Sequence, residues 1–182
     1  MMPSGRSVRN EHPRGSGPGT VRAMASNDPL ALVRRVMAGD RWAAGAGARL
    51  VEVRPGYARV RMKVEDRHLN GVEVVQGGAI FTLADFAFAV CCNSHGTVAV
   101  ALDVSITFAR PATRGVLVAE ATEASRTRRT SVCEVRVTDA EGTLVALFRG
   151  TAFRKEDPLS AVLEGRRAAR QRPPRRQAGR SR

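Results

Sequence analysis

The amino-acid sequence predicts an α+β fold in which an antiparallel β-sheet wraps around one long central helix. The stretch 77–92 is apolar on every face of a helix, which is typical of a helix buried on all sides. Six runs with the alternating pattern of strands surround it, two before it and four after it. No internal repeat divides the 182 residues. A single sheet enclosing the helix is the economical way to bury it.

The elements follow one another between clear turn signals. A short helix over 30–38 is predicted after the capping group Asn27-Asp28-Pro29, with Pro29 near its first turn and Gly39 at its end. A hairpin follows, with strands 48–54 and 57–64 and a Pro-Gly turn between them. The segment 65–75 is irregular, and the long helix comes next, ending near Gly96. The four remaining strands are predicted at 97–109, 115–124, 131–138 and 143–153.

The distribution of charge and the composition indicate one folded domain flanked by two basic tails. The chain carries a net charge of +13, of which residues 1–23 contribute +3 and residues 164–182 contribute +7. Segments rich in Arg, Gly, Pro and Ser cannot build a core. We therefore expect disordered extensions at 1–26 and 156–182 around one domain at 27–155. No aromatic residue lies among the arginines of the second tail, so we expect solvated tails rather than a nucleic-acid-binding arm.

The three cysteines and the hydrophobic runs indicate a cytoplasmic protein. The cysteines show no C-x-x-C spacing, so neither a zinc site nor a disulfide framework is predicted. The first thirty residues contain no apolar run long enough for a signal peptide. The central helix would be roughly 24 Å long, too short to span a membrane. We expect no membrane partner.

The central helix contains an acidic residue that needs an explanation. Thr82 and Asp85 are the polar side chains inside its apolar run, and they share one stripe of the helix. Burial penalises the ionised carboxylate, so the pKa of Asp85 should be raised. Such perturbed groups are common at functional sites. The alternative is a structural carboxylate in a contact between subunits.

Several strings in this order resemble the hotdog-fold acyl-CoA thioesterases, and among them the phenylacetate-pathway (PaaI) type. They are HLNG at 68–71, GGAIFTLAD at 77–85, AFA at 87–89, CNS at 92–94, FARP at 108–111 and VALFRG at 145–150. The resemblance covers about 27–155 and leaves the tails unmatched. It implies hydrolysis of an acyl-CoA thioester, such as (hydroxy)phenylacetyl-CoA or a similar short or medium acyl group, to the free acid and coenzyme A.

The resemblance also implies roles for individual residues. Asp85 would be the nucleophile or the general base, Asn70 would hold the carbonyl or the water, and Thr82 would line the site. Arg128 and Arg129 would contact the phosphates of coenzyme A, which is part of the substrate; no metal or other cofactor is expected. The alternatives are an ordinary turn residue for Asn70 and an exposed basic turn for the two arginines. His68 is expected to be a solvent-facing loop residue.

The start of the central helix suggests how an acyl carbonyl is held. Backbone N–H groups are unpaired at a helix N-terminus, and Gly77 and Gly78 would let a carbonyl approach them as in an oxyanion hole. Close backbone packing is the alternative reason for these glycines. Asp85 lies eight residues on, about 12 Å along the axis. A second subunit must therefore supply it, so we expect an obligate homodimer and, by resemblance, a homotetramer.

One position departs from the family pattern. The residue before the two glycines is usually His, and here it is Gln76. Glutamine donates and accepts hydrogen bonds but does not take up a proton near neutral pH. Activity survives if this position only orients groups. Two other functions stay open: a non-catalytic acyl-CoA-binding sensor and an enoyl-CoA hydratase, although the missing His argues against the hydratase.

Overall fold

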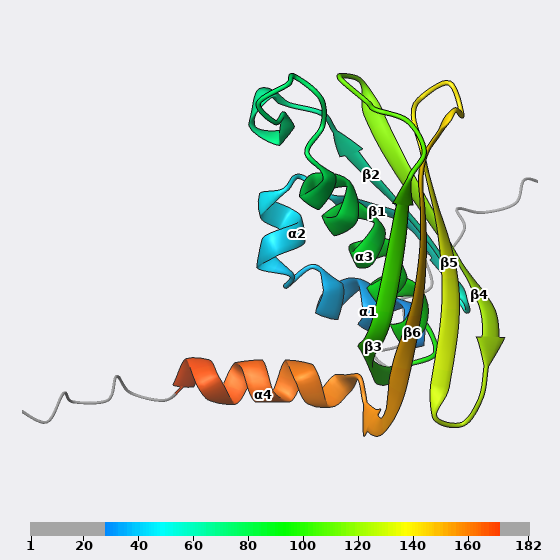
Figure 1. Ribbon diagram of the computed structural model, residues 1–182. Coiled ribbons are helices and arrows are strands. Elements are labelled where there is room, and N and C mark those ends of the chain that lie inside the picture. Colours follow the sequence, from blue (N-terminus) through cyan, green and yellow to red (C-terminus); the bar gives the residue numbers. More distant parts are fainter. Residues whose placement is uncertain (1–27, 172–182) are drawn as a thin grey trace, which may run out of the picture.

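A computed structural model describes residues 28–171 of the chain, and its architecture agrees with the predicted fold (Figure 1). Four α-helices, one short 3-10 helix and six strands make up these residues. They occur in the order α1 (Pro29–Met37), α2 (Arg41–Gly45), β1 (Arg49–Arg54), β2 (Tyr57–Lys63), η1 (Asp66–His68), α3 (Gly77–Asn93), β3 (Thr97–Phe108), β4 (Val116–Arg126), β5 (Thr130–Thr138), β6 (Leu144–Pro158) and α4 (Ser160–Gln171). The predicted N-terminal extension lies outside the described residues.

The sheet is fully antiparallel, and its spatial order is β1-β2-β4-β5-β6-β3. Helix α3 lies in the concave face of this sheet and contacts all six strands (Figure 1). Strand β5 alternates buried and more exposed side chains, as expected for a strand with one face on the core. The predicted arrangement of one sheet around one helix is confirmed.

Two details fix α3 against the sheet. Gly150 on β6 leaves room for Phe88, because a Cβ atom at position 150 would lie 2.8 Å from the phenyl ring. At the C-terminal end of the helix the buried Asn93 donates to the Ala89 carbonyl and accepts from the Ala99 N–H, at 2.9 and 3.0 Å. The bond with Ala99 joins the last turn of α3 to the start of β3.

The three thiols lie together where α3 meets β5. Cys133 Sγ is 3.3 Å from Cys91 Sγ and 3.4 Å from Cys92 Sγ, and all three side chains are buried and free. The hydrogen bond with Cys133, together with burial, raises the pKa of Cys91 and of Cys92. Both groups are therefore thiols packed as small apolar residues.

The N-terminal helices cover part of α3. Asp28 caps α1 by accepting from the Leu30 N–H, and Asp40 caps α2 by accepting from the Ala43 N–H at 2.9 Å. Helix α2 was not predicted, because five residues are too few for a periodic pattern. It lies on the side of α3 away from the sheet (Figure 1).

The segment expected to be a disordered tail from residue 156 is ordered in part. Strand β6 continues to Pro158, and α4 occupies Ser160–Gln171. Leu159 explains the difference, since it is buried in the core and its N–H donates to the Gly96 carbonyl at 2.9 Å. Arg166 on α4 donates to the Val36 carbonyl at the end of α1 at 3.0 Å. The rest of the predicted tail, 172–182, lies outside the described residues.

Strand β3 is the long edge of the sheet, pairing with β6 on one side only. Several large apolar side chains along it are exposed, and Leu102, at 62%, is the most exposed of them. Long apolar edges of this kind are normally covered in a native protein. None of the described helices is long and apolar enough to cross a membrane.

Candidate active site

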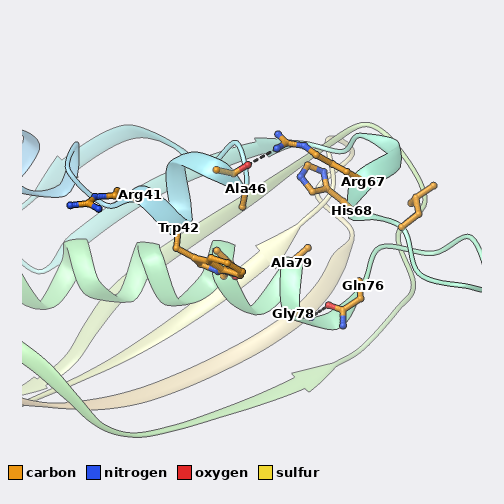
Figure 2. Close-up of a pocket in the computed structure, with 11 residues that line it drawn as sticks. Arg41, Trp42, Ala46, Arg67, His68, Gln76, Gly78 and Ala79 are labelled. Atoms are coloured by element: carbon orange, nitrogen blue, oxygen red, sulfur yellow. Dashed lines mark hydrogen bonds between the residues drawn. The ribbon is translucent and has the colours of Figure 1, made fainter. Parts of the chain in front are cut away.

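Two neighbouring cavities lie between α2 and α3. The larger, about 650 Å³, is lined by residues of α2, of the η1 segment and of the first turns of α3, including Trp42, His68, Gln76, Gly78 and Thr82 (Figure 2). The smaller, about 120 Å³, is lined by Asp85 with Asp40, Trp42, Phe81 and Thr82 among others. Trp42 and Thr82 line both. Gln76, Gly78, Thr82 and Asp85 therefore border one region of the surface.

Asp85 carries a carboxylate that has no partner among the described residues. It forms neither a hydrogen bond nor an ion pair there, and no arginine neutralises it. Burial, and secondly the charge of Asp40, raise the pKa of Asp85 above 3.8, its ordinary value. The sequence-based expectation of a raised pKa is confirmed. A carboxylate of this kind is a stronger base than an exposed one.

Thr82 lies one turn before Asp85 and bonds to a different side chain. Its Oγ1 accepts from Trp42 Nε1 at 3.0 Å, and no hydrogen bond joins it to Asp85. Trp42 is 77% exposed despite this bond. It was not singled out from the sequence, and a lone tryptophan in an unassigned segment gives little signal of its position.

The N-terminus of α3 is partly occupied by its own cap. Gln76 Oε1 accepts from the Gly78 N–H, so the side chain that replaces the family His bonds a helix amide (Figure 2). The Gly77 N–H has no hydrogen-bond partner among the described residues. Position 77 is also crowded, because a Cβ atom there would lie 3.1 Å from Phe108 Cζ. One amide without a hydrogen-bond partner among the described residues therefore lies at a glycine in the first turn of α3.

Asn70 adopts the turn role that was weighed as its alternative. Its Oδ1 accepts from the Val72 N–H at 3.0 Å and the Val74 N–H at 3.3 Å. Such a bond shapes the loop that leads into α3. Neither Asn70 nor Gly77 lines the two cavities described above.

The two arginines of the predicted coenzyme A contact lie elsewhere in the chain. Arg128 and Arg129 occupy the β4–β5 turn and line a separate cavity of about 330 Å³, with Arg154 and Lys155. Arg128 pairs with Glu156 at 3.2 Å, and both side chains are well exposed. Within one chain the structure does not bring these arginines to Asp85.

His68 was expected to face solvent, and that expectation is wrong. Its side chain is 5% exposed and lines the larger cavity. The spacing Glu65-x-x-His68 offered a weak signal, because it allows the imidazole to bond the Glu65 N–H at the start of η1. The cavity that His68 lines is bordered by α2, which the sequence pattern did not predict.

Comparisons with known proteins agree with this geometry. The sequence model of the Thioesterase superfamily matches residues 73–146. The acyl-coenzyme A thioesterase PaaI of Escherichia coli is 38% identical over 116 residues, which cover 63% of this chain and 83% of the relative.

Solved structures give the same result. The structure of E. coli PaaI, from the phenylacetic acid degradation operon, superposes with a TM-score of 0.70 and 34% identity over 73% of this chain and 97% of that one. The crystal structure of a hypothetical thioesterase protein with coenzyme A, from Streptococcus pneumoniae, superposes with a TM-score of 0.64 and 26% identity over 68% of this chain and 98% of that one. The chain thus has the hotdog fold and belongs to the thioesterase superfamily, a family of thioester hydrolases, alongside the PaaI-type acyl-CoA thioesterases.

Proposed function

We propose that the protein hydrolyses acyl-CoA thioesters, with (hydroxy)phenylacetyl or similar short to medium acyl groups, in the cytoplasm. The observation that carries the proposal is the unpaired, partly buried carboxylate of Asp85, which lines a small cavity beside Trp42 and Phe81. The names of the E. coli relative and of the S. pneumoniae complex support the class of substrate.

In the proposed reaction Asp85 acts as general base. It removes a proton from a water molecule, whose oxygen attacks the thioester carbonyl carbon. The carbonyl oxygen then carries the negative charge, which the free Gly77 N–H at the positive end of α3 would stabilise. Collapse of this intermediate breaks the C–S bond and releases the acid and the thiol of coenzyme A, which takes up the proton.

Direct attack by Asp85 is the other route, and it passes through an anhydride between Asp85 and the acyl group. A single turnover in ¹⁸O-labelled water establishes the anhydride route if the label appears in Asp85. General-base catalysis places the label in the free acid in the first turnover. Nucleophilic attack followed by water addition at the Asp85 carbonyl leaves the label in the enzyme.

The proposed site needs two chains. Eight residues separate Gly77 from Asp85 in α3, so an acyl carbonyl at the amide of one helix cannot reach the carboxylate of the same helix. The exposed apolar edge of β3 supports a dimer in which two sheets join. We propose this dimer as the active unit, and a tetramer built from two of them.

Arg128 and Arg129 are proposed to bind the phosphates of coenzyme A. Their side chains and those of Arg154 and Lys155 border one cavity, so a phosphate there would meet four basic residues beside the carboxylates of Glu156 and Asp157. Because this cavity is remote from Asp85 in the same chain, the pantetheine arm of the substrate would have to cross between subunits.

Release of free thiol from a panel of acyl-CoAs tests the proposed function. Wild type should turn over arylacetyl or medium-chain substrates, and Asp85→Asn should be slower by about 10²- to 10⁴-fold. Glu164→Gln is the control, because it removes an exposed negative charge on α4 away from the cavities. Equal rates for wild type and Asp85→Asn would remove Asp85 from the mechanism.

One observation favours a second function, that of a non-catalytic acyl-CoA sensor. Gln76 caps the Gly78 amide, so one of the two amides near the proposed oxyanion position is already occupied. Tight binding of an acyl-CoA without any turnover by wild type would support the sensor and contradict the hydrolase.

A further inference from the structure

His68 has one ring nitrogen bonded and the other free. Nδ1 accepts a hydrogen bond from the Glu65 N–H at 3.0 Å. A nitrogen that accepts in this way bears no proton, so the proton of the neutral ring lies on Nε2. The backbone thereby fixes His68 as a donor through Nε2–H.

The free nitrogen is buried without a partner. Among the described residues, Nε2 of His68 is one of three buried side-chain nitrogen or oxygen atoms that have no hydrogen-bond partner. A buried donor left unpaired costs about 1–3 kcal/mol, so it is normally retained where a partner arrives from elsewhere. Thr97 and Arg154 hold the other two such atoms, and neither residue lines the larger cavity.

His68 also lies at the right place for a ligand contact. Its ring projects from η1 toward the space between α2 and the first turn of α3 (Figure 2). Its own carbonyl accepts from the Gln76 N–H at 2.7 Å, which holds the η1 segment against the start of α3. The walls of the cavity combine apolar side chains with donors from Arg41, Arg67 and Gln76. Those three side chains are exposed, whereas His68 is buried, so its ring is held in place before a ligand arrives.

We propose that the Nε2–H of His68 donates a hydrogen bond to an oxygen atom of the bound acyl thioester. This inference rests on the proposed function for the identity of the ligand. The acceptor is either the thioester carbonyl oxygen or an oxygen carried by the acyl chain, and a donor that is already buried and oriented favours substrates offering that oxygen. His68 is then a substrate-contact residue in addition to Asp85 and the α3 amides.

Two substitutions separate the bond in the cavity from the bond to Glu65. His68→Asn places an oxygen near the position of Nδ1, so it keeps the Glu65 N–H satisfied and loses the donor in the cavity. His68→Gln reaches the position of Nε2 with an amide N–H, so it keeps the donor and loses the bond to Glu65. A residue that only shapes η1 would tolerate Asn better than Gln, whereas a substrate donor would tolerate Gln better than Asn.

The substrates are two phenylacetyl-CoAs of equal size, one with a ring hydroxyl and one with a methyl group in the same position. If Nε2–H meets the acyl oxygen, His68→Asn should lower kcat/KM about ten-fold or more for the hydroxylated substrate alone. If Nε2–H meets the thioester carbonyl, His68→Asn should lower kcat by a similar factor for both substrates. His68→Gln should restore most of either loss, although its melting temperature is lower.

If His68→Asn hydrolysed both substrates at wild-type rates, the inference would be overturned. It would also be overturned if His68→Asn and His68→Gln lost activity equally and in proportion to their loss of thermal stability. Calorimetric binding of the same pair to Asp85→Asn, with and without His68→Asn, is the second readout. This binding measurement tests whether Nε2–H contacts the ligand even if wild type hydrolyses neither substrate, because it gives the loss of affinity on removing Nε2–H directly. Equal affinities together with equal rates leave no role for His68 Nε2.

Discussion

Asp40 and Asp85 line the same small cavity, and the negative charge of Asp40 contributes to the raised pKa of Asp85. Asp40 has a structural task as well, since its Oδ1 caps α2 through the Ala43 N–H at 2.9 Å. A helix cap thus also adjusts the basicity of the proposed catalytic group.

Asp40→Asn should lower the pKa of Asp85, because the neutral amide removes the repulsion and still caps the helix. The acidic limb of the pH profile of kcat/KM, where Asp85 takes up its proton, should move to lower pH. A profile over about pH 4 to 8 measures this shift for wild type and variant. An unchanged limb would show that another group controls it.

Asp85→Asn should stabilise the fold at neutral pH although it slows the reaction. A raised pKa means that the folded state holds the proton more tightly than the unfolded chain, so the ionised carboxylate weakens folding at high pH. The melting temperature of the variant should exceed that of wild type at pH 7 to 8. The difference should shrink as the pH falls through the raised pKa toward 3.8, the ordinary value. A variant less stable than wild type at pH 8 would contradict this sign.

The proposed dimer predicts that a charge on the β3 edge stops catalysis. Leu102→Glu should give a monomer by analytical ultracentrifugation and lose nearly all activity, because a desolvated carboxylate at the joined edge is costly. Val51→Glu is the matched control, an apolar side chain 47% exposed on β1, the opposite edge of the sheet. It should remain an active dimer. An active Leu102→Glu monomer would rule out a site shared between chains.

Neutralising Arg128 and Arg129 should weaken substrate binding and leave the chemical step intact. The Gln double variant should raise KM for an acyl-CoA by about 5- to 20-fold, since each phosphate contact is a charge-assisted hydrogen bond. The same acyl group on N-acetylcysteamine lacks the nucleotide and serves as the control substrate. If both substrates respond equally to the substitutions, the arginines do not bind the nucleotide.

Leu159→Ala should cost about 2–5 kcal/mol of the free energy of unfolding, the usual range for a buried leucine. A chain ending at residue 155 should be destabilised further, because it loses both this side chain and α4, whereas a chain ending at 171 should match the full chain. Urea denaturation measures all three. Equal stability of the 155 and 171 forms would show that α4 and Leu159 contribute nothing.

Local patterns were sufficient to predict most of the fold. The Pro55-Gly56 turn and the alternation around it determined the first hairpin, and the all-apolar stretch determined α3. Helix α4 was missed because its sequence is rich in arginine, and the contact that anchors it, Arg166 with the Val36 carbonyl, joins residues 130 positions apart. No local pattern reveals such a contact.

The site was predictable to a lesser extent. A carboxylate inside an apolar helix was sufficient to identify Asp85 as perturbed, because burial follows from the pattern and raises the pKa. The cavity beside His68 and the bond of Trp42 to Thr82 both involve α2, a helix too short for a sequence signal. The orientation of the Gln76 side chain is set by its hydrogen bond with the Gly78 N–H. No pattern of residue types in the sequence predicts this bond.

The cluster of Cys91, Cys92 and Cys133 gives the molecule an internal reporter of its own unfolding. All three sulfur atoms are shielded in the native core, so an alkylating reagent can modify them only in molecules whose helix has separated from its sheet. The rate of labelling, followed by mass, would then measure how often the core opens without any dye or added tag. Substrate that closes the interface between chains should slow that labelling.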